Sequence, residues 1–563
     1  MNLLNPKLFA KSYPDDETRE IMLKTIDFFE SMGLTKLKAD YENRRWYDEF
    51  LEFNRKHKIF ATLLTPEGYA DGARWDSSRI IDFAEILAFY GLTYWYCFQV
   101  TALGVGSIFL GGNEALKKKT AKLLRQGEIF GFGLSEKEHG ADIYSSEMAL
   151  DPRADGGYLA HGEKYYIGNG NQAALINTFG KFSESGDYVF FCVDSQHSKY
   201  ECIKNIINNQ CYVAHFKLSS YPISQDDISL SGQAAWDCCL NTVNVMKFNL
   251  GVAAIGIATH CYYEALNHAA NRFLFNHYVT DFEHIKQLFM DSYVRLAAMR
   301  LYTHRARDYM RSAGSDDKRY LLYNSLVKMK VTTQGEEVVN LLWDIIAARG
   351  FEKDMYFENA TIDIRALPKL EGTVHVNMAL IVKFMAAYFF NAETFPDVAV
   401  REDAANDKFI FHQGPAKGLS KVRFHDYRTG LNGCSLPNVR IFKRQTEMFR
   451  LMLMLARPKS RQIKDIDFLL IIGELFCLVA YAQLILECWT LKQTDDAMLE
   501  QIFDFLIRDF SKFALQLYSK NSSTALQKFF CKRIIKCPKP NPARFDRVLR
   551  ESVYSLKGAY TMN

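Results

Sequence analysis

The sequence of 563 residues lacks several features that identify common protein classes. Its twelve cysteines include no C-x-x-C pair, which excludes the usual zinc and thioredoxin-type spacings. No G-x-G-x-x-G or Walker loop occurs, which argues against a doubly wound nucleotide-binding sheet. The longest apolar run, Phe468 to Leu486, is interrupted by Glu474, so we predict a buried helix rather than a membrane span. The net charge of only +4 speaks against a nucleic-acid partner.

What the chain does contain is typical of large packed domains. It is 48% hydrophobic and 14% aromatic, with 42 phenylalanines and 30 tyrosines, which suits large cores and apolar ligand cavities. The N-terminal stretch reaches Asp15 and Asp16 too soon for a signal peptide. We therefore expect an intracellular, soluble protein with reduced thiols, cytoplasmic if bacterial, without a signal peptide or transmembrane segment.

The pattern of apolar residues changes along the chain, and the predicted strands do not alternate with helices. Apolar residues at helical spacing, then short β-rich runs between turns, then long helices, predict an α+β fold that is mostly α. The expected domains are an N-terminal α-helical domain (1–130), a middle β domain (131–242), a C-terminal four-helix bundle (243–395) and a basic helical extension (396–563).

Three short segments carry residue types suited to chemistry. Phe132 to Asp142 lies where helices give way to strands, and its amides and hydroxyl could meet a flat heterocycle, although an ordinary turn would read the same way. Lys164 to Gly170 places adjacent aromatics in a strand, as sheet packing also does. Glu371, before Gly-Thr at a helix start, is placed for general-base work or is a plain helix-start carboxylate.

The order and spacing of these segments resemble the acyl-CoA dehydrogenase family over about residues 20–390. The family motifs L-T-E-P-x-A-G-S-D, N-G-T-K-x-W-I-T, R-K-x-F-G, G-G-x-G-F and E-G-T are similar, in this order, to Leu134–Asp142, His161–Gly168, Arg272–Asn276, Ala347–Phe351 and the segment that begins at Glu371.

The resemblance implies an FAD enzyme that converts acyl-CoA thioesters to trans-2-enoyl-CoA, as in fatty-acid β-oxidation. Glu371 would remove the proton next to the thioester carbonyl, the flavin would take the hydride, and an electron-transfer flavoprotein would accept the electrons. A homodimer or larger oligomer is implied, because Arg272 and Phe275 match residues that reach the neighbouring subunit's FAD. No metal is expected. The implied cofactor-binding residues are Phe132, Leu134, Ser135, Tyr166, Gly168, Arg272, Phe275, Asp344, Ala348 and Thr373, and the implied substrate-binding residues are Gly140, Ala141 and Gly372.

The chain also departs from the family pattern. Gly168 stands where the family has a Thr or Ser that bonds the flavin, Tyr166 replaces the stacking Trp, and Asp344 replaces a Gln that meets the pyrophosphate. These departures leave open an acyl-CoA oxidase, an acyl-carrier-protein dehydrogenase, or a catalytically impaired, flavin-poor paralogue that acts as a binding protein.

The C-terminal extension differs in charge from the rest. Residues 401–563 hold 27 Lys and Arg against 16 Asp and Glu, whereas residues 1–400 carry net −7. Within Lys528–Lys536, cations interleave with apolar residues, as in a helix lying on a membrane surface. A peripheral membrane contact and simple packing on the bundle are the two alternatives, and we favour packing because the run from Phe468 to Leu486 needs burial.

Overall fold

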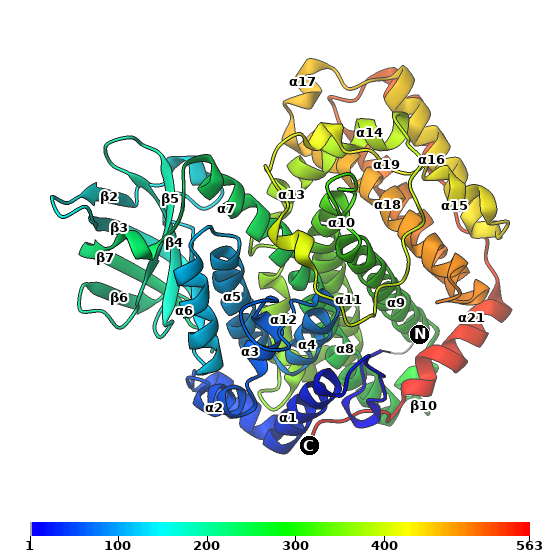
Figure 1. Ribbon diagram of the computed structural model, residues 1–563. Coiled ribbons are helices and arrows are strands. Elements are labelled where there is room, and N and C mark those ends of the chain that lie inside the picture. The colour runs from blue at the N-terminus through cyan, green and yellow to red at the C-terminus, as the bar shows by residue number, and fades with distance from the viewer. Residues whose placement is uncertain (1–2) are drawn as a thin grey trace. The chain divides into compact units, whose positions relative to one another are not determined.

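The computed structural model describes residues 3–563 and divides them into two compact units (Figure 1). The first, called the sheet unit here, comprises residues 10–249, 402–417 and 562–563. The second, called the helical unit, comprises the residues up to 9, 250–401 and 418–561. Each unit is described by itself.

Seven helices and eight strands form the sheet unit. Helix starts follow from capping side chains: Asp76 accepts hydrogen bonds from the amides of Ser78 and Arg79, and Asn113 accepts one from Leu116. The elements are α1 (Asp16–Glu42), α2 (Asp48–His57), α3 (Ile59–Leu64), α4 (Ser77–Tyr90), α5 (Leu92–Phe109), α6 (Glu114–Arg125), β1 (Phe130–Gly133), β2 (Ala149–Pro152), β3 (Tyr158–Gly168), β4 (Leu175–Phe182), β5 (Tyr188–Val193), β6 (Tyr200–Asn205), β7 (Val213–Ile223), β8 (Ile228–Ser231) and α7 (Gly232–Met246).

The strands form one sheet in the order β6-β7-β3-β2-β4-β5-β8, with β1 paired in parallel to β4. Its core is an apolar cluster that includes Ile176, Phe191, Phe216 and Leu218, all nearly inaccessible to solvent. Helix α5 is buried along its whole length and lies against β1. A Cβ on Gly104 of α5 would lie 2.6 Å from the carbonyl oxygen of Gly131, so glycine permits this close approach.

Long helices make up the helical unit. Its elements are α8 (Phe248–Asn271, from Leu250 onward), the hairpin β9 (Phe273–Leu274) and β10 (His277–Tyr278), α9 (Glu283–Arg311), α10 (Tyr320–Leu326), α11 (Thr332–Ile346), α12 (Tyr356–Ala366), α13 (Val374–Ile381), α14 (Met385–Phe390), α15 (Arg428–Gly433), α16 (Pro437–Leu455), α17 (Ser460–Ile463), α18 (Ile466–Thr490), α19 (Asp496–Ser519), α20 (Ala525–Ile534) and α21 (Pro542–Val548). A π-helical segment, 327–331, joins α10 to α11.

The C-terminal extension packs directly on the bundle, and α18 and α19 both lie beside α9 (Figure 1). The Tyr302 and Tyr481 rings stack with centroids 4.6 Å apart, and the Cys488 thiol donates to the Leu301 carbonyl at 3.4 Å. The run from Phe468 to Leu486 forms most of α18 and is largely buried, as predicted.

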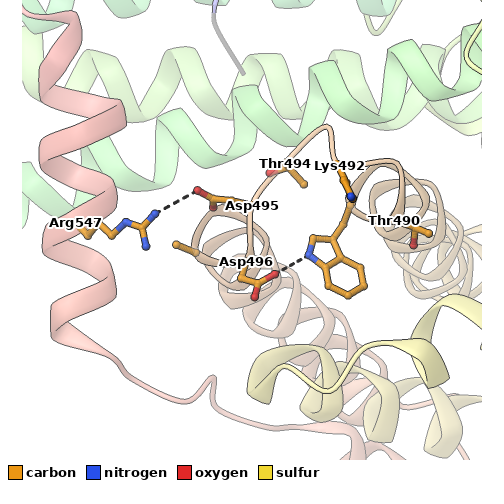
Figure 2. A pocket seen from close by; sticks show the side chains of 8 residues that line it. Thr490, Lys492, Thr494, Asp495, Asp496 and Arg547 are labelled. Atoms are coloured by element: carbon orange, nitrogen blue, oxygen red, sulfur yellow. Dashed lines mark hydrogen bonds and ion pairs between the residues drawn. The ribbon is translucent and has the colours of Figure 1, made fainter.

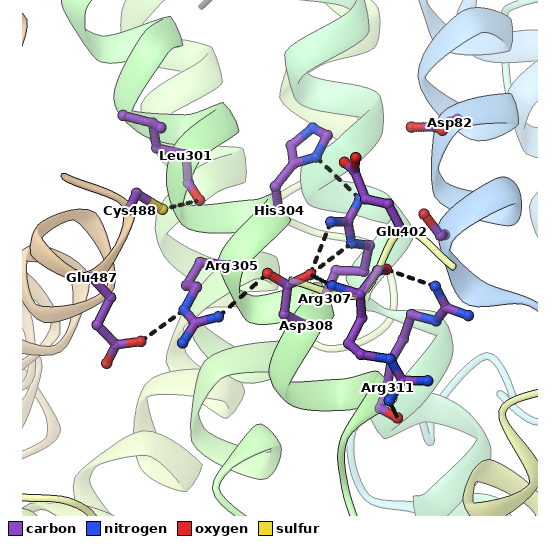
Figure 3. A network of polar contacts seen from close by, with 12 residues as sticks. Asp82, Leu301, His304, Arg305, Arg307, Asp308, Arg311, Glu402, Glu487 and Cys488 are labelled. Carbon is purple, nitrogen blue, oxygen red and sulfur yellow. Dashed lines mark hydrogen bonds and ion pairs between the residues drawn. The ribbon is translucent and has the colours of Figure 1, made fainter. Parts of the chain in front are cut away.

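A buried polar network also joins α9 to α18 (Figure 3). Asp308 pairs with Arg307 at 2.8 Å, and the Arg305 Nε donates to a Glu487 carboxylate oxygen at 2.8 Å. Arg305, Arg307 and Asp308 are nearly inaccessible to solvent, and a buried charge is costly unless it is paired. The close partners of these three residues compensate for the water that they lose. This network holds the extension on the bundle.

One helix begins earlier than predicted. Long helices were expected from residue 243, but α7 starts at Gly232 and ends at Met246, directly before α8. Two helical stretches, Gly232–Asn271 and Ile466–Thr490, are long and apolar enough to cross a membrane by length and composition alone. In the structure 89% and 83% of their most apolar windows are buried, as in core helices. The predicted α+β, mostly α architecture is confirmed, and the four-domain division stays a prediction.

Candidate active site

The segment after β1 joins the middle of strand β3 through backbone and hydroxyl contacts. The Ser135 hydroxyl donates to the Tyr165 carbonyl at 2.7 Å, and the Tyr165 amide donates to the Ser135 carbonyl at 2.9 Å. Phe132 stacks on Phe190 at 5.7 Å, and Leu134 packs on the same cluster. The predicted Ser135 hydroxyl is therefore used within the sheet unit, although its oxygen can still accept a hydrogen bond.

Two further predicted residues lie on the exposed loop that follows. Gly140 and Ala141 are both open to solvent. Nearby, the carboxylates of Glu136 and Glu147 and the His139 ring approach closely enough for a metal ion. The Glu136 oxygens already accept hydrogen bonds from Lys164, the Ser146 hydroxyl and two backbone amides, so this carboxylate is part of the polar network of the sheet unit.

Tyr166 stands out from the sheet. Its φ is +66°, at a register shift between Lys164 and Ile167 on β3, and its side chain is 57% exposed. A non-glycine residue in the left-handed region is uncommon and marks a place where the surrounding structure dictates the backbone. The ring is therefore presented to solvent, as a platform for a flat ligand would be.

Gly168 ends the same strand where helix α5 comes close. A Cβ there would lie 2.6 Å from Val100 Cγ1 and 2.8 Å from Tyr96 Cε1, so no side chain fits without movement. The next residue, Asn169, is fully buried and donates to the carbonyls of Cys97 and Phe130. Glycine at 168 is thus set by packing, which the sequence pattern does not reveal.

Glu371 lies in the helical unit, in a strained turn before α13. Its φ is +48° and that of Gly372 is +91°. Thr373 caps α13 by accepting from the Val376 amide, and the Asn377 amide group donates to the Gly372 carbonyl at 2.9 Å. The turn that carries Glu371 is therefore fixed from its C-terminal side by the helix it precedes.

A cationic cluster brings together two predicted parts of the chain. The His268 ring on α8 lies 3.4 Å from Arg272 Nη1 and 3.5 Å from Arg349 Nη1. Burial, followed by Arg349 and Arg272, lowers the pKa of His268 and favours its neutral form. Phe275, at the hairpin turn, is 87% exposed. Sequence reasoning missed His268, because one of its two partners, Arg349, lies 81 residues further along the chain.

The end of α11 completes the predicted set. Asp344 and Ala348 are both exposed. Ala347 has φ +55°, a conformation that favours glycine, at the position where the family pattern has glycine. Ala347 therefore holds a conformation that is strained for a residue with a side chain.

A cavity of about 580 Å³ lies elsewhere, at the loop between α18 and α19 (Figure 2). The Trp489 indole donates to Asp496 at 2.8 Å, and Arg547 approaches Asp495 at 3.6 Å. None of the predicted site residues lines this cavity, and these polar groups bond one another. The cavity is therefore separate from the candidate site.

The predicted residues thus form separate groups within each unit. The sheet unit brings Ser135 next to Tyr165 and Tyr166. The helical unit brings Arg272 next to Arg349 through His268, and holds Glu371 apart in its own turn before α13.

Comparison with known proteins shows which proteins this chain resembles. Residues 236–386 match the family model "Acyl-CoA dehydrogenase, C-terminal domain". A 3-(aryl)acrylate reductase from Clostridium sporogenes is 24% identical over 288 residues, covering 50% of this chain and 74% of the relative. A glutaryl-CoA dehydrogenase from Desulfococcus multivorans is 22% identical over 356 residues, covering 61% and 89%.

The fold is similar over nearly the whole chain, extension included. The crystal structure of an acyl-CoA dehydrogenase from Bacillus anthracis, complexed with FAD, superposes with a TM-score of 0.76. It is 16% identical and covers 98% of this chain and 97% of its own. The predicted resemblance is confirmed: residues 236–386 match the model of the acyl-CoA dehydrogenase C-terminal domain, and the chain is similar to members of this family in sequence and has their fold.

Proposed function

We propose that this protein is an FAD-dependent oxidoreductase that dehydrogenates acyl-CoA thioesters between the α and β carbons, with Glu371 as the base. The observation that carries the proposal is the turn holding Glu371. A glutamate at φ +48°, followed by a glycine at +91° and a capped helix, is a strained and specific arrangement. Strain of about 1–3 kcal/mol per such residue persists where the surrounding structure fixes it, and it is concentrated at active sites.

The residues present fit FAD in chemical type. The exposed Tyr166 ring offers a flat apolar surface for the isoalloxazine system. Arg272 and Arg349, gathered around His268, offer cations for the pyrophosphate. Asp344 is the one predicted contact of the wrong charge, and it is exposed, where water screens it. FAD is therefore the cofactor that we assign.

The chemistry assigned to this chain is removal of one proton. Glu371 would accept the proton from the α carbon, leaving its electron pair to form the double bond. When bound, FAD supplies the acceptor for the hydride from the β carbon. An electron-transfer flavoprotein is the partner we propose for reoxidation, and the products are a trans-2-enoyl thioester and a protonated Glu371.

Three alternatives depend on the departures from the family pattern. Because no side chain fits at Gly168 without movement, the flavin would lack a hydroxyl donor there, and this departure keeps an acyl-CoA oxidase and an acyl-carrier-protein dehydrogenase as alternatives. A flavin-poor binding protein remains the alternative from another class.

The test begins with the purified protein and its colour. The proposal predicts a yellow protein that retains FAD through gel filtration. Anaerobic mixing with acyl-CoAs of several chain lengths should bleach the flavin band for at least one of them. Glu371→Gln should retain FAD and bind the same acyl-CoA, but reduce the flavin more slowly by several orders of magnitude, because the amide cannot take the proton.

The outcomes separate the candidates. Reduction of Glu371→Gln at the wild-type rate would show that the base is elsewhere. A colourless protein that binds no added FAD would leave only the flavin-poor alternative. Reoxidation of reduced protein by oxygen as fast as by an electron-transfer flavoprotein would favour the oxidase.

A further inference from the structure

A buried ion pair lies directly behind the segments that carry Ser135 and Tyr166. Lys164 on β3 has no exposed surface, and Glu136 is 6% exposed. The Lys164 ammonium donates to a Glu136 carboxylate oxygen at 2.7 Å, to the Leu134 carbonyl at 3.0 Å and to the Ser146 hydroxyl at 3.3 Å. Its three N–H groups therefore have three acceptors.

The carboxylate is equally well satisfied. Glu136 accepts from the Ser146 hydroxyl at 2.6 Å and from the amides of Glu147 and Met148 at 2.8 and 3.1 Å. Burial alone would raise the pKa of Glu136, but Lys164 and these hydrogen bonds hold it below its ordinary value. Burial lowers the pKa of Lys164 to about 8. At neutral pH both groups are charged, and each is the other's compensation for lost water.

The pair is adjacent in sequence to both halves of the proposed flavin surface. Glu136 follows Ser135, and Lys164 precedes Tyr165 and Tyr166, whose backbone is in the left-handed region. The same ammonium also holds the carbonyl of Leu134. The turn after β1 and the bulge on β3 are thus joined through one buried charge, in addition to the contacts between Ser135 and Tyr165.

We infer that Glu136 and Lys164 are positioning residues for the cofactor: their ion pair fixes the turn at Ser135 against the bulge at Tyr166, and so sets how tightly and in which orientation the flavin ring is held. The inference rests on the proposed function for its ligand. The structural part of the inference is that one buried ion pair holds two ligand-facing segments together. This effect can also be measured in the protein without FAD. Neither residue touches the cofactor in this proposal.

The test removes both charges together, because removing one would leave the other buried and unpaired. The double variant Glu136→Gln/Lys164→Met is compared with Lys11→Met/Asp82→Asn, which removes another ion pair of the sheet unit, at 2.7 Å. FAD is titrated into each apo-protein and followed by flavin fluorescence and visible circular dichroism. Hydrogen exchange is measured over residues 134–148 and 164–168 in the apo-proteins.

We expect the Glu136/Lys164 variant to bind FAD at least about tenfold more weakly, with an altered flavin dichroism band and faster exchange in both segments. The Lys11/Asp82 variant should keep wild-type values in all three measurements. An unchanged Kd and dichroism band in a folded Glu136/Lys164 variant would overturn the inference while leaving the proposed function intact. A wild-type protein that binds no FAD would overturn the proposed function instead, and the inference with it.

A milder variant decides the matter if the double variant does not fold. Ser146→Ala keeps both charges but removes the hydroxyl that bonds each of them. It should weaken FAD binding in the same direction by a smaller factor and alter the dichroism band. Wild-type FAD binding by Ser146→Ala would then overturn the inference.

Discussion

Arg295 on α9 and Asp509 on α19 form a two-pronged ion pair inside the helical unit, with N–O distances of 2.8 and 3.1 Å. Arg295 is 4% exposed and Asp509 7%. The guanidinium also lies 3.3 Å from Glu337 and over the Phe505 ring. The two partners are far apart in the chain, so this pair is one of the contacts by which the extension becomes part of the bundle.

Breaking this pair should destabilise the helical unit. Asp509→Asn removes the closest acidic partner of the buried guanidinium and leaves Glu337 at 3.3 Å, and we expect a loss of about 3 kcal/mol, at the lower end for a broken buried pair. Calorimetry should show a clearly lower Tm. The matched control is Glu551→Gln, whose partners Arg547 and Arg550 are exposed, and which should leave the Tm unchanged. Equal Tm values for the two variants would contradict this role.

The pair of Arg295 and Asp509 should also contribute to the loss of stability at low pH. Burial alone would raise the pKa of Asp509, but Arg295 outweighs it and holds the pKa below the ordinary 3.8. A lowered folded-state pKa stabilises the protein above 3.8, and this contribution is lost as the pH falls through the folded value. The Tm difference between wild type and Asp509→Asn should therefore be constant above about pH 5 and shrink below 3.8. A difference that grows on acidification would refute the assignment.

Introducing the family's serine at position 168 should destabilise the protein for steric reasons. Gly168→Ser places a Cβ 2.6 Å from Val100 Cγ1, and such overpacking typically costs about 1–3 kcal/mol. We expect a lower Tm and weaker FAD retention. Val100→Ala removes the methyl group that clashes most closely, so the double variant should recover part of the Tm that Gly168→Ser alone loses. A Gly168→Ser protein with the wild-type Tm and faster flavin reduction would contradict this steric argument. It would show that position 168 accepts a hydroxyl side chain and that the wild-type protein lacks it for another reason.

The exposed hairpin after α8 should mediate association. Phe273 and Phe275 are 57% and 87% exposed, and large exposed apolar groups that cluster mark interfaces. We propose a homodimer in which this hairpin reaches the partner's cofactor, so Phe275→Glu should shift the protein to monomers and lower its FAD content. Light scattering with absorbance at the flavin band measures both. Ile362→Glu, 58% exposed on α12, is the control and should remain dimeric; a wild-type monomer fully loaded with FAD would contradict the proposal.

The extension should not bind membranes. On α20 the apolar face predicted to lie on lipid is used within the fold, since Phe530, Cys531 and Ile534 are buried. Phe529 and Leu526 remain about half exposed beside cations. We expect no co-sedimentation with vesicles of anionic phospholipid at low salt. Binding that high salt abolishes, and that Phe529→Ala weakens, would instead establish a peripheral membrane contact.

The sequence by itself determined the features that are local or that depend on order along the chain. The change near 131 from helical apolar spacing to short β-rich runs between turns predicted the position of the sheet, and the run from Phe468 to Leu486 predicted a buried helix. The candidate base was identified in the same way, because Glu371 with its Gly-Thr is a contiguous motif. Such patterns are legible because helix and strand periodicity act over a few residues.

Only the tertiary structure decided what depends on residues distant in the chain. It showed that Gly168 is required by Val100 and Tyr96, that His268 bridges Arg272 and Arg349, and that the apolar face of α20 points inward. The start of helix α7 at Gly232 was also decided by the tertiary structure. Its segment, Gly232–Met246, mixes small, polar and β-branched residues, so local propensity does not define its start. Close approach, charge pairing and the choice of buried face are set by which surfaces meet, and one-dimensional spacing does not contain that information.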